Sequence, residues 1–213
     1  MERIAELKEV VIQGDMGRAR PLAERALEAG LEPGVILDQA LISGMDKVGE
    51  LFKENEIYVP EVLLAAKAMQ QAMQVLKPHL VRSGIEPRGK VVVGTVRGDL
   101  HDIGKNLVAM MLEGAGFEVI DLGNDVPSER FVQAAVENEA KIIGMSALLT
   151  TTMHVMKETI ERLKDEGLSD GVKTMIGGAP VTATFAKDIG ADGYGDDAAS
   201  AVDLAKRFIG DGS

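Results

Sequence analysis

The sequence contains no cysteine and no tryptophan, and aromatic residues make up only 3% of its 213 positions. Without cysteine, disulfide bonds and thiolate metal sites are excluded, so a bound metal would depend on histidine or carboxylate ligands. With so few aromatic rings, the hydrophobic core must be built from aliphatic side chains and from the 11 methionines. Histidines and carboxylates are therefore the side chains in which to look for metal chemistry.

Basic residues are also scarce relative to acidic ones. The chain has 23 Lys and Arg against 34 Asp and Glu, a net charge of −11, and no basic run. This balance argues against nucleic acids and anionic membrane surfaces as partners. No apolar run reaches the length of a membrane span, and the first residues, Met1 to Arg3, do not open a signal peptide. We expect a cytoplasmic protein.

The first part of the chain, residues 1–86, contains only helical patterns. Apolar residues such as Ile4, Leu7 and Val11 recur at helical spacing, and the pattern predicts four amphipathic helices in a bundle. The last of these helices is expected to open at Tyr58, with Pro60 in its first turn, and to end by Pro78.

The polar segment RSGIEPRG, residues 82–89, separates the helical patterns from alternating strand and helix patterns. We place a domain boundary there, which gives a helical domain at 1–86 and an α/β domain at 87–213. Five strand–helix units predict a flavodoxin-like, doubly wound parallel sheet of five strands. The expected strands are 90–96, 117–121, 141–146, 172–176 and 192–194, and the expected helices are 103–113, 128–137, 153–166, 180–188 and 197–208.

Asp99 and His101 follow the first expected strand, at the edge where open α/β sheets bind ligands. A carboxylate two residues before a histidine can accept the proton of one ring nitrogen and leave the other nitrogen free to bind a metal. His79 and His154 have no such neighbour. Taken alone, the pair is more often a structural contact than a metal site.

Two further motifs stand at the ends of later strands. The third strand is followed by the segment 146–152, SALLTTT, whose hydroxyls could simply cap the next helix. The fourth is followed by Gly177 and Gly178, a pair common in tight turns. Glycines here, and Gly104 in the first loop, would also let the backbone approach a buried ligand closely.

The three motifs, Asp99-x-His101-x-x-Gly104, Ser146-x-Leu148 and Gly177-Gly178, occur in this order along the chain. Together they resemble the signature of cobamide-binding modules that carry cobalt with a histidine as the lower ligand, including the cobalamin module of methionine synthase. The sequence is most similar to the stand-alone corrinoid proteins of methanol, methylamine and methoxy-aromatic methyltransferase systems. The resemblance covers nearly the whole chain, including its helical part.

The resemblance implies a base-off, histidine-on cobamide, cobalamin or a variant with another lower base. His101 would ligate the cobalt, Asp99 would orient the imidazole, and a hydroxyl would complete the chain of hydrogen bonds. That hydroxyl is assigned to Thr152, where methionine synthase has serine, with Thr150 and Thr151 as alternatives. The implied cofactor-binding set is Asp99, Leu100, His101, Asp102, Ile103, Gly104, Ser146, Leu148, Thr150, Thr152, Gly177, Gly178, Tyr194, Tyr58 and Met69.

In the proteins that this chain resembles, the helical domain covers the upper face of the corrin. By that likeness Tyr58, Val62, Ala65 and Met69 are the candidate cap contacts, although a methionine such as Met69 is on general grounds core filler. Tyr194 would line the slot for the nucleotide tail, and a surface position is nearly as good an interpretation.

The implied function is that of a methyl carrier between a substrate-specific methyltransferase and a tetrahydrofolate- or thiol-dependent one, with a reductive activator as a further partner. We find no second catalytic constellation, which fits a carrier subunit better than a complete enzyme. Both transfers need the upper face, so the cap would swing aside, with residues 82–89 as the hinge.

Other functions are less consistent with the sequence. A cobalamin sensor would need an output domain, usually basic, whereas residues 1–86 carry 10 basic and 14 acidic side chains, a net of −4. The cobalamin subunit of an isomerase would not be expected to carry a four-helix cap. A phosphoacceptor receiver would need an aspartate where the third strand ends in Met145 and Ser146. A flavin or nucleotide binder remains as an alternative, because a fold alone proves no function.

Overall fold

The computed structural model describes residues 2–210 of the chain. These residues form two compact units that divide between Pro87 and Arg88, with the short segment Gly114–Gly116 grouped with the first unit. Within the described residues, no helix is both long enough and apolar enough to cross a membrane.

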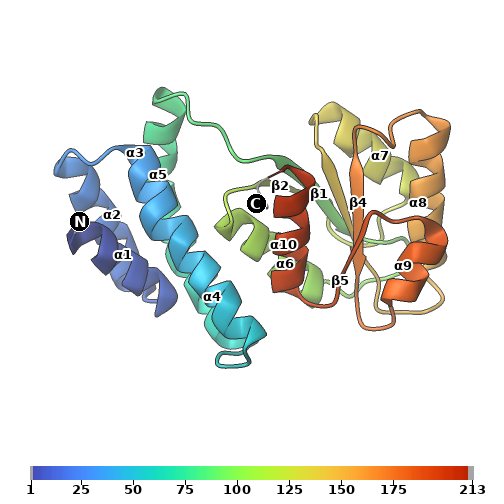
Figure 1. Ribbon diagram of the computed structural model, residues 1–213, viewed down its shortest axis with the longest axis horizontal. Helices are drawn as coiled ribbons and strands as arrows, with labels where there is room; N and C mark the ends of the chain where they lie inside the picture. Colours follow the sequence, from blue (N-terminus) through green and yellow to red (C-terminus); the bar gives the residue numbers. More distant parts are fainter. Residues whose placement is uncertain (1, 211–213) are drawn as a thin grey trace. The chain divides into compact units, whose positions relative to one another are not determined.

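The first unit is entirely helical (Figure 1). Helix α2 packs along α5, and α1 packs against α2 and α4. The core between them is aliphatic, with Leu7, Leu41 and Leu76 fully buried. Its elements are α1 (Glu2–Ile12), α2 (Met16–Glu28), α3 (Pro33–Ile36), the π-helix η1 (Leu37–Ile42), α4 (Ser43–Lys53) and α5 (Val59–Arg82).

The helix starts follow local chemistry. The carboxylate of Asp15 accepts the backbone N–H of Arg18 at 3.2 Å and caps α2, and the Glu61 carboxylate accepts the Tyr58 N–H at 3.0 Å at the start of α5. Pro33 occupies the first turn of α3, where a missing N–H removes no helical hydrogen bond.

Two helices in this unit differ from the sequence-based prediction. Helix α5 continues through Pro78 to Arg82, so the prediction that it ends by Pro78 was wrong. The proline forfeits one backbone hydrogen bond, but Leu80 beyond it is buried, and its burial favours continuing the helix. The third predicted helix, expected to open at Glu32 and Pro33 and to run to about Phe52, is present, but the π-helical segment Leu37–Ile42 interrupts its regular turns.

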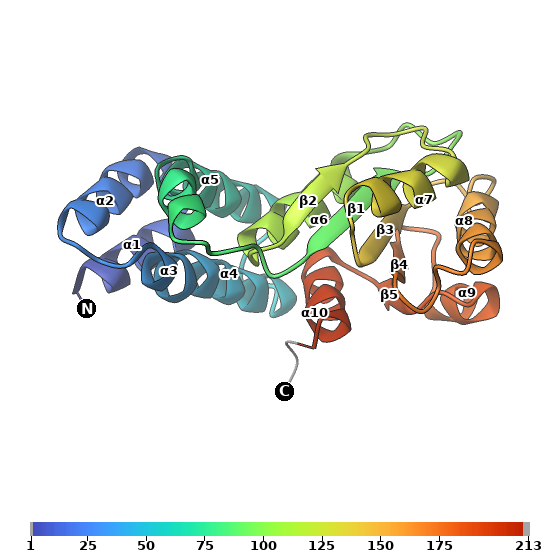
Figure 2. The ribbon, with the colours of Figure 1, turned by 90° about the horizontal axis from the view of Figure 1, so that it is seen from above.

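The second unit is a five-stranded, all-parallel sheet of order β2-β1-β3-β4-β5, the flavodoxin-like order. The predicted fold class is confirmed. Helices α7, α8 and α9 cover one face of the sheet, and α6 and α10 cover the other (Figure 1; Figure 2). The elements are β1 (Lys90–Thr95), α6 (Ile103–Gly114), β2 (Glu118–Asp121), α7 (Ser128–Glu137), β3 (Ile142–Ser146), α8 (His154–Asp165), β4 (Lys173–Gly177), α9 (Ala183–Ile189), β5 (Gly193–Gly195) and α10 (Ala198–Phe208).

The core under α7, α8 and α9 is built from aliphatic residues of the strands packed around Phe131 and Met156. A Cβ added to Gly94 in β1 would lie 2.8 Å from the Phe131 ring, so this glycine makes room for the ring. Helix α9 begins at Ala183 rather than at the predicted Pro180, because the Thr182 hydroxyl accepts the Phe185 N–H at 3.1 Å and caps the helix there.

Candidate functional site

The register of the sheet brings the three sequence motifs to one edge. Thr95, at the end of β1, is the partner of Ser146 at the end of β3, and Ser146 is the partner of Gly177 at the end of β4. The loops that follow these strands therefore leave the sheet side by side. This edge is the one at which open parallel sheets bind their ligands.

Asp99 and His101 form a close pair in the β1–α6 loop. Nδ1 of His101 lies 2.7 Å from Oδ1 of Asp99, and the His101 backbone N–H donates to the same oxygen at 3.1 Å. The Thr95 hydroxyl, at the end of β1, donates a hydrogen bond to the His101 carbonyl at 2.9 Å and so fixes the loop to the strand. Because a carboxylate can only accept, Nδ1 carries the ring proton and Nε2 is the nitrogen that offers a lone pair. The His101 side chain is 54% exposed, so Nε2 is accessible to a ligand.

The second oxygen of the fully buried Asp99 carboxylate is bound by the β3–α8 loop. The backbone N–H groups of Leu148 and Leu149 donate to Oδ2 at 2.7 and 3.1 Å. Burial alone would raise the pKa of Asp99, but hydrogen bonds from Leu148, His101 and Leu149 outweigh it and lower the pKa to about 2. Asp99 is therefore an anion at neutral pH. It connects the β1–α6 loop, residues 96–102, which we call the histidine loop, to the β3–α8 loop.

The surface around His101 is apolar and exposed. The side chains of Leu100 and Ile103 are 70% and 79% exposed, and Leu148 is exposed as well. A Cβ added at Gly104 would meet nothing within 4 Å. Apolar side chains gathered in the open beside a histidine indicate a surface that a flat, largely apolar ligand can cover.

No group of three or more His, Cys, Asp or Glu side chains that could hold a metal ion occurs among residues 2–210. His101 offers one nitrogen donor, so a metal held by it would need further ligands from a bound group. The exposed Leu100 and Ile103 side chains beside it leave apolar surface that such a group could cover.

Comparison with known proteins identifies the family. Residues 89–203 match a family model described as a B12 binding domain, and residues 3–77 match a second model of that description. The chain is 46% identical over 210 residues to trimethylamine corrinoid protein 1 of Methanosarcina acetivorans, covering 98% of this chain and 97% of that protein. It belongs to the B12-binding corrinoid protein family. The resemblance predicted from the three motifs is confirmed.

Other members of the corrinoid family cover the chain equally well. A corrinoid protein of Desulfitobacterium hafniense is 42% identical over 213 residues, with 99% of each chain covered. Among solved structures, the methanol:cobalamin methyltransferase complex of Methanosarcina barkeri matches with a TM-score of 0.87 and 33% identity, covering 98% of this chain and 80% of that one. A cobalamin-binding protein of Desulfitobacterium hafniense matches with a TM-score of 0.81 and 35% identity, covering 97% and 98%.

Of the three predicted hydroxyls, that of Thr152 lies within hydrogen-bonding distance of Asp99. Thr152 is buried, whereas Thr150 and Thr151 are exposed. Its Oγ1 is 3.2 Å from Oδ2 of Asp99 but only 2.8 Å from the carbonyl oxygen of Leu149. One hydroxyl hydrogen cannot serve both acceptors fully, and the shorter contact favours the carbonyl. The backbone amides of the loop, which sequence reasoning did not single out, therefore hold Asp99 more firmly than the hydroxyl does.

Replacing Thr152 tests whether the backbone amides hold Asp99 more firmly than the Thr152 hydroxyl does. We expect Thr152→Val to lower the free energy of unfolding by about 1 kcal/mol, because one secondary hydrogen bond is lost while the Leu148 and Leu149 amides remain. Thr152→Ser keeps the hydroxyl and serves as the control; it should cost about 0.8 kcal/mol, because it removes a buried methyl group and no hydrogen bond. Urea unfolding at pH 7 measures both. A loss from Thr152→Val as large as that from Asp99→Asn would contradict this account.

The paired glycines are explained by the backbone around them. A Cβ on Gly178, whose φ is +122°, would lie 1.9 Å from the Ala147 carbonyl oxygen, and one on Gly177 would lie 2.7 Å from the Gly195 carbonyl oxygen. The chain itself already makes a close approach that requires glycine at both positions, and the approach of a ligand to them stays a prediction. Tyr194 is half-buried and packs against the core under α7, α8 and α9 rather than standing free on the surface.

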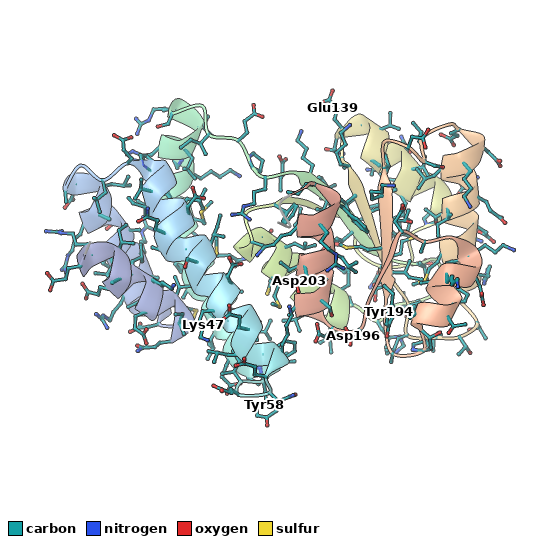
Figure 3. All side chains as sticks on the ribbon, viewed as in Figure 1. Lys47, Tyr58, Glu139, Tyr194, Asp196 and Asp203 are labelled. Carbon is teal, nitrogen blue, oxygen red and sulfur yellow. The ribbon has the colours of Figure 1, made fainter. Side chains whose placement is uncertain are left out.

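The four candidate cap residues of the helical unit differ in exposure. Tyr58 is 64% exposed at the start of α5 (Figure 3). Val62, Ala65 and Met69 are buried, as expected for side chains that fill the core of a helical unit. The structure therefore presents Tyr58 alone of the four at the surface.

Two acidic positions in and before the β2–α7 loop were not singled out from the sequence. Asp121, at the end of β2, accepts hydrogen bonds from the buried Lys105 ammonium with both carboxylate oxygens, and Nζ lies 2.6 Å from Oδ1. This ion pair connects α6 to β2. Asp125 contacts the histidine loop directly: its Oδ1 accepts the Gly98 N–H at 2.7 Å. The sequence signal that could have indicated these two residues is that each carboxylate lies at or just after the end of β2, at the same edge of the sheet as His101.

Proposed function

We propose that this chain is a methyl-carrier protein that binds a cobamide in the base-off form with His101 as the lower cobalt ligand. The observation that carries the proposal is the His101–Asp99 pair. Nδ1 of His101 is hydrogen-bonded to Oδ1 of Asp99 at 2.7 Å, and Nε2 is left accessible. The family supports it, since relatives are named as trimethylamine and dimethylamine corrinoid proteins and a structural neighbour is a methanol:cobalamin methyltransferase complex.

The residues at the sheet edge suit such a cofactor. His101 would hold the cobalt, the exposed side chains of Leu100, Ile103 and Leu148 would lie against the macrocycle, and Gly104 would leave room beside it. Ser146 and Gly177 end β3 and β4, and Thr150 and Gly178 lie in the loops that follow these strands. When bound, the cobamide supplies a cobalt centre that accepts and releases a methyl group.

The chain's own part in the chemistry is to control the imidazole. Because the pKa of Asp99 is lowered to about 2, its carboxylate stays charged and keeps the proton on Nδ1 of His101. The imidazole is thereby presented as a neutral donor at Nε2. Because the lone pair of a neutral imidazole is at this one nitrogen, a metal bond and a proton at Nε2 exclude each other. The Asp99–His101 pair can thus alternate between ligating and holding a proton.

Two partner enzymes follow from the carrier role: a substrate-specific methyltransferase that loads the methyl group and a tetrahydrofolate- or thiol-dependent methyltransferase that removes it. A reductive activator would restore carriers that lose their reduced state. In this proposal the helical unit caps the upper face, the exposed Tyr58 at the start of α5 is its contact with the cofactor, and residues 82–89 allow it to move aside.

The decisive experiment reconstitutes the protein with methylcobalamin and records its visible spectrum for wild type and His101→Ala. We expect wild type to show a histidine-ligated, base-off cofactor and His101→Ala to lose the nitrogen ligand. His154→Ala is the matched control, because His154 is equally exposed but its Nδ1 contacts only the Thr151 carbonyl of its own helix start. An unchanged spectrum for His101→Ala would refute the ligand assignment.

A further inference from the structure

The loop between β2 and α7, residues 122–127, holds the backbone of the histidine loop along its length. The Arg97 N–H donates to the Val126 carbonyl at 2.8 Å, and the Asn124 side-chain amide donates to the Leu100 carbonyl at 3.3 Å. Between these two contacts lies Asp125. Each backbone position from 97 to 100 is thus hydrogen-bonded to residues 124–126.

Asp125 grips the Asp99 backbone from both sides. Its Oδ1 accepts the N–H of Gly98 at 2.7 Å, and its own backbone N–H donates to the carbonyl of Asp99 at 3.1 Å. Two peptide groups, Arg97–Gly98 before Asp99 and Asp99–Leu100 after it, are therefore each held by a hydrogen bond from this one residue. Asp99 in turn holds the His101 ring.

The backbone conformation of Asp125 restricts which residues fit there. Its φ is +54°, in the left-handed region, where aspartate and asparagine are tolerated far better than most side chains. The position thus requires both tolerance of this conformation and a short side chain that accepts a hydrogen bond. Asparagine satisfies both requirements, glycine only the first, and alanine neither.

We propose that Asp125 is a positioning residue that sets the orientation of His101 for ligation, acting through the Gly98–Asp99 backbone and the Asp99 carboxylate. This rests on the proposed function, in which Nε2 of His101 binds the metal. A metal bond is directional, so a small rotation of Asp99 turns the ring away from its best approach. Residues that orient a ligand in this way typically change metal affinity about 10- to 100-fold when they are replaced.

The test compares Asp125→Gly with Asp125→Asn. Asp125→Gly keeps the left-handed backbone and removes only the acceptor, whereas Asp125→Asn keeps both. The matched control is Glu139→Gly, because Glu139 has the same left-handed conformation, with φ +56°, in the turn between α7 and β3 (Figure 3). That turn leads into the start of β3, away from the strand ends that carry the histidine loop.

Two readouts are taken: methylcobalamin affinity with the visible spectrum, and hydrogen exchange of the Gly98 amide in cofactor-free protein. We expect Asp125→Gly to weaken the histidine-ligated form about tenfold and to speed Gly98 exchange by a similar factor. Asp125→Asn and Glu139→Gly should match wild type in both.

The proposal is overturned if Asp125→Gly leaves the visible spectrum and the methylcobalamin affinity unchanged, whether or not hydrogen exchange of the Gly98 amide quickens. It is also overturned if Asp125→Asn weakens the affinity as much as Asp125→Gly does. Failure of the proposed function is recognised separately, because wild type itself would then bind no methylcobalamin or would be unaffected by His101→Ala.

Discussion

Replacing Asp99 with asparagine is expected to lower the free energy of unfolding by about 3 kcal/mol, because a buried, fully hydrogen-bonded carboxylate is lost. Asparagine has one acceptor oxygen where Asp99 has two, so its NH₂ group would face N–H donors of His101 or of Leu148 and Leu149. Urea unfolding at pH 7 measures the loss.

The control for this substitution is Asp188→Asn in α9, where the residue is exposed and no hydrogen bond would be lost; we expect a change within about 0.5 kcal/mol. A loss in Asp99→Asn no greater than in Asp188→Asn would show that the buried carboxylate contributes nothing to the fold.

The same carboxylate makes stability depend on pH in acid. The pKa of Asp99 is lowered from 3.8 to about 2 in the folded protein, so between these values the unfolded chain binds more protons than the folded one. Its contribution, on the order of 2 kcal/mol, is therefore present above about pH 4 and is lost as pH falls toward 2. We expect wild type to lose more stability over this interval than Asp99→Asn does.

Gly178→Ala should be the most damaging small substitution in the α/β unit, at about 4 kcal/mol or more. The added Cβ would overlap the Ala147 carbonyl oxygen at 1.9 Å, and the φ of +122° is one that alanine rarely adopts. Because Ala147 lies in the loop that binds Asp99, relief of the clash would also disturb the site. Chemical unfolding measures the effect. If the variant folds too poorly for an unfolding curve, the yield of soluble protein is compared with that of wild type instead.

Gly104→Ala is the comparison that separates a glycine needed by the fold from one needed by a ligand. Its Cβ would meet nothing within 4 Å, and alanine in a helix is favoured over glycine by about 1 kcal/mol, so stability should be unchanged or slightly higher. Under the proposed function, methylcobalamin affinity should nevertheless fall. Equal destabilisation by both substitutions would contradict the packing account of Gly178.

Hydrophobic periodicity was sufficient to predict the helical first part of the chain and the parallel five-stranded sheet, because buried strands and amphipathic helices leave different spacings. Those spacings describe regular elements, and they do not say whether a break is tolerated. The burial of Leu80 carries α5 past Pro78, and the turns of η1 accommodate residues that the pattern treats as an ordinary helix. Both outcomes depend on tertiary packing that a local pattern does not contain.

The contact between Asp99 and His101 was predictable, because it depends on two side chains whose spacing the sequence shows. What sequence reasoning missed is backbone chemistry: the amides of Leu148 and Leu149 on Asp99, and the clash that makes Gly178 necessary. Any residue has an N–H, so its identity does not reveal such a donor. Asp125 was missed for a related reason, because its left-handed conformation and its partner Gly98 become evident only once the two loops are side by side.

The chain has no tryptophan and only two tyrosines, and each compact unit contains one of them. Tyr58 is in water at the head of α5, whereas Tyr194 rests on the core of the sheet. Intrinsic ultraviolet emission therefore comes from one reporter per unit, and a Tyr58→Phe or Tyr194→Phe variant isolates the other. The melting of the two units can be followed one at a time without attaching a dye.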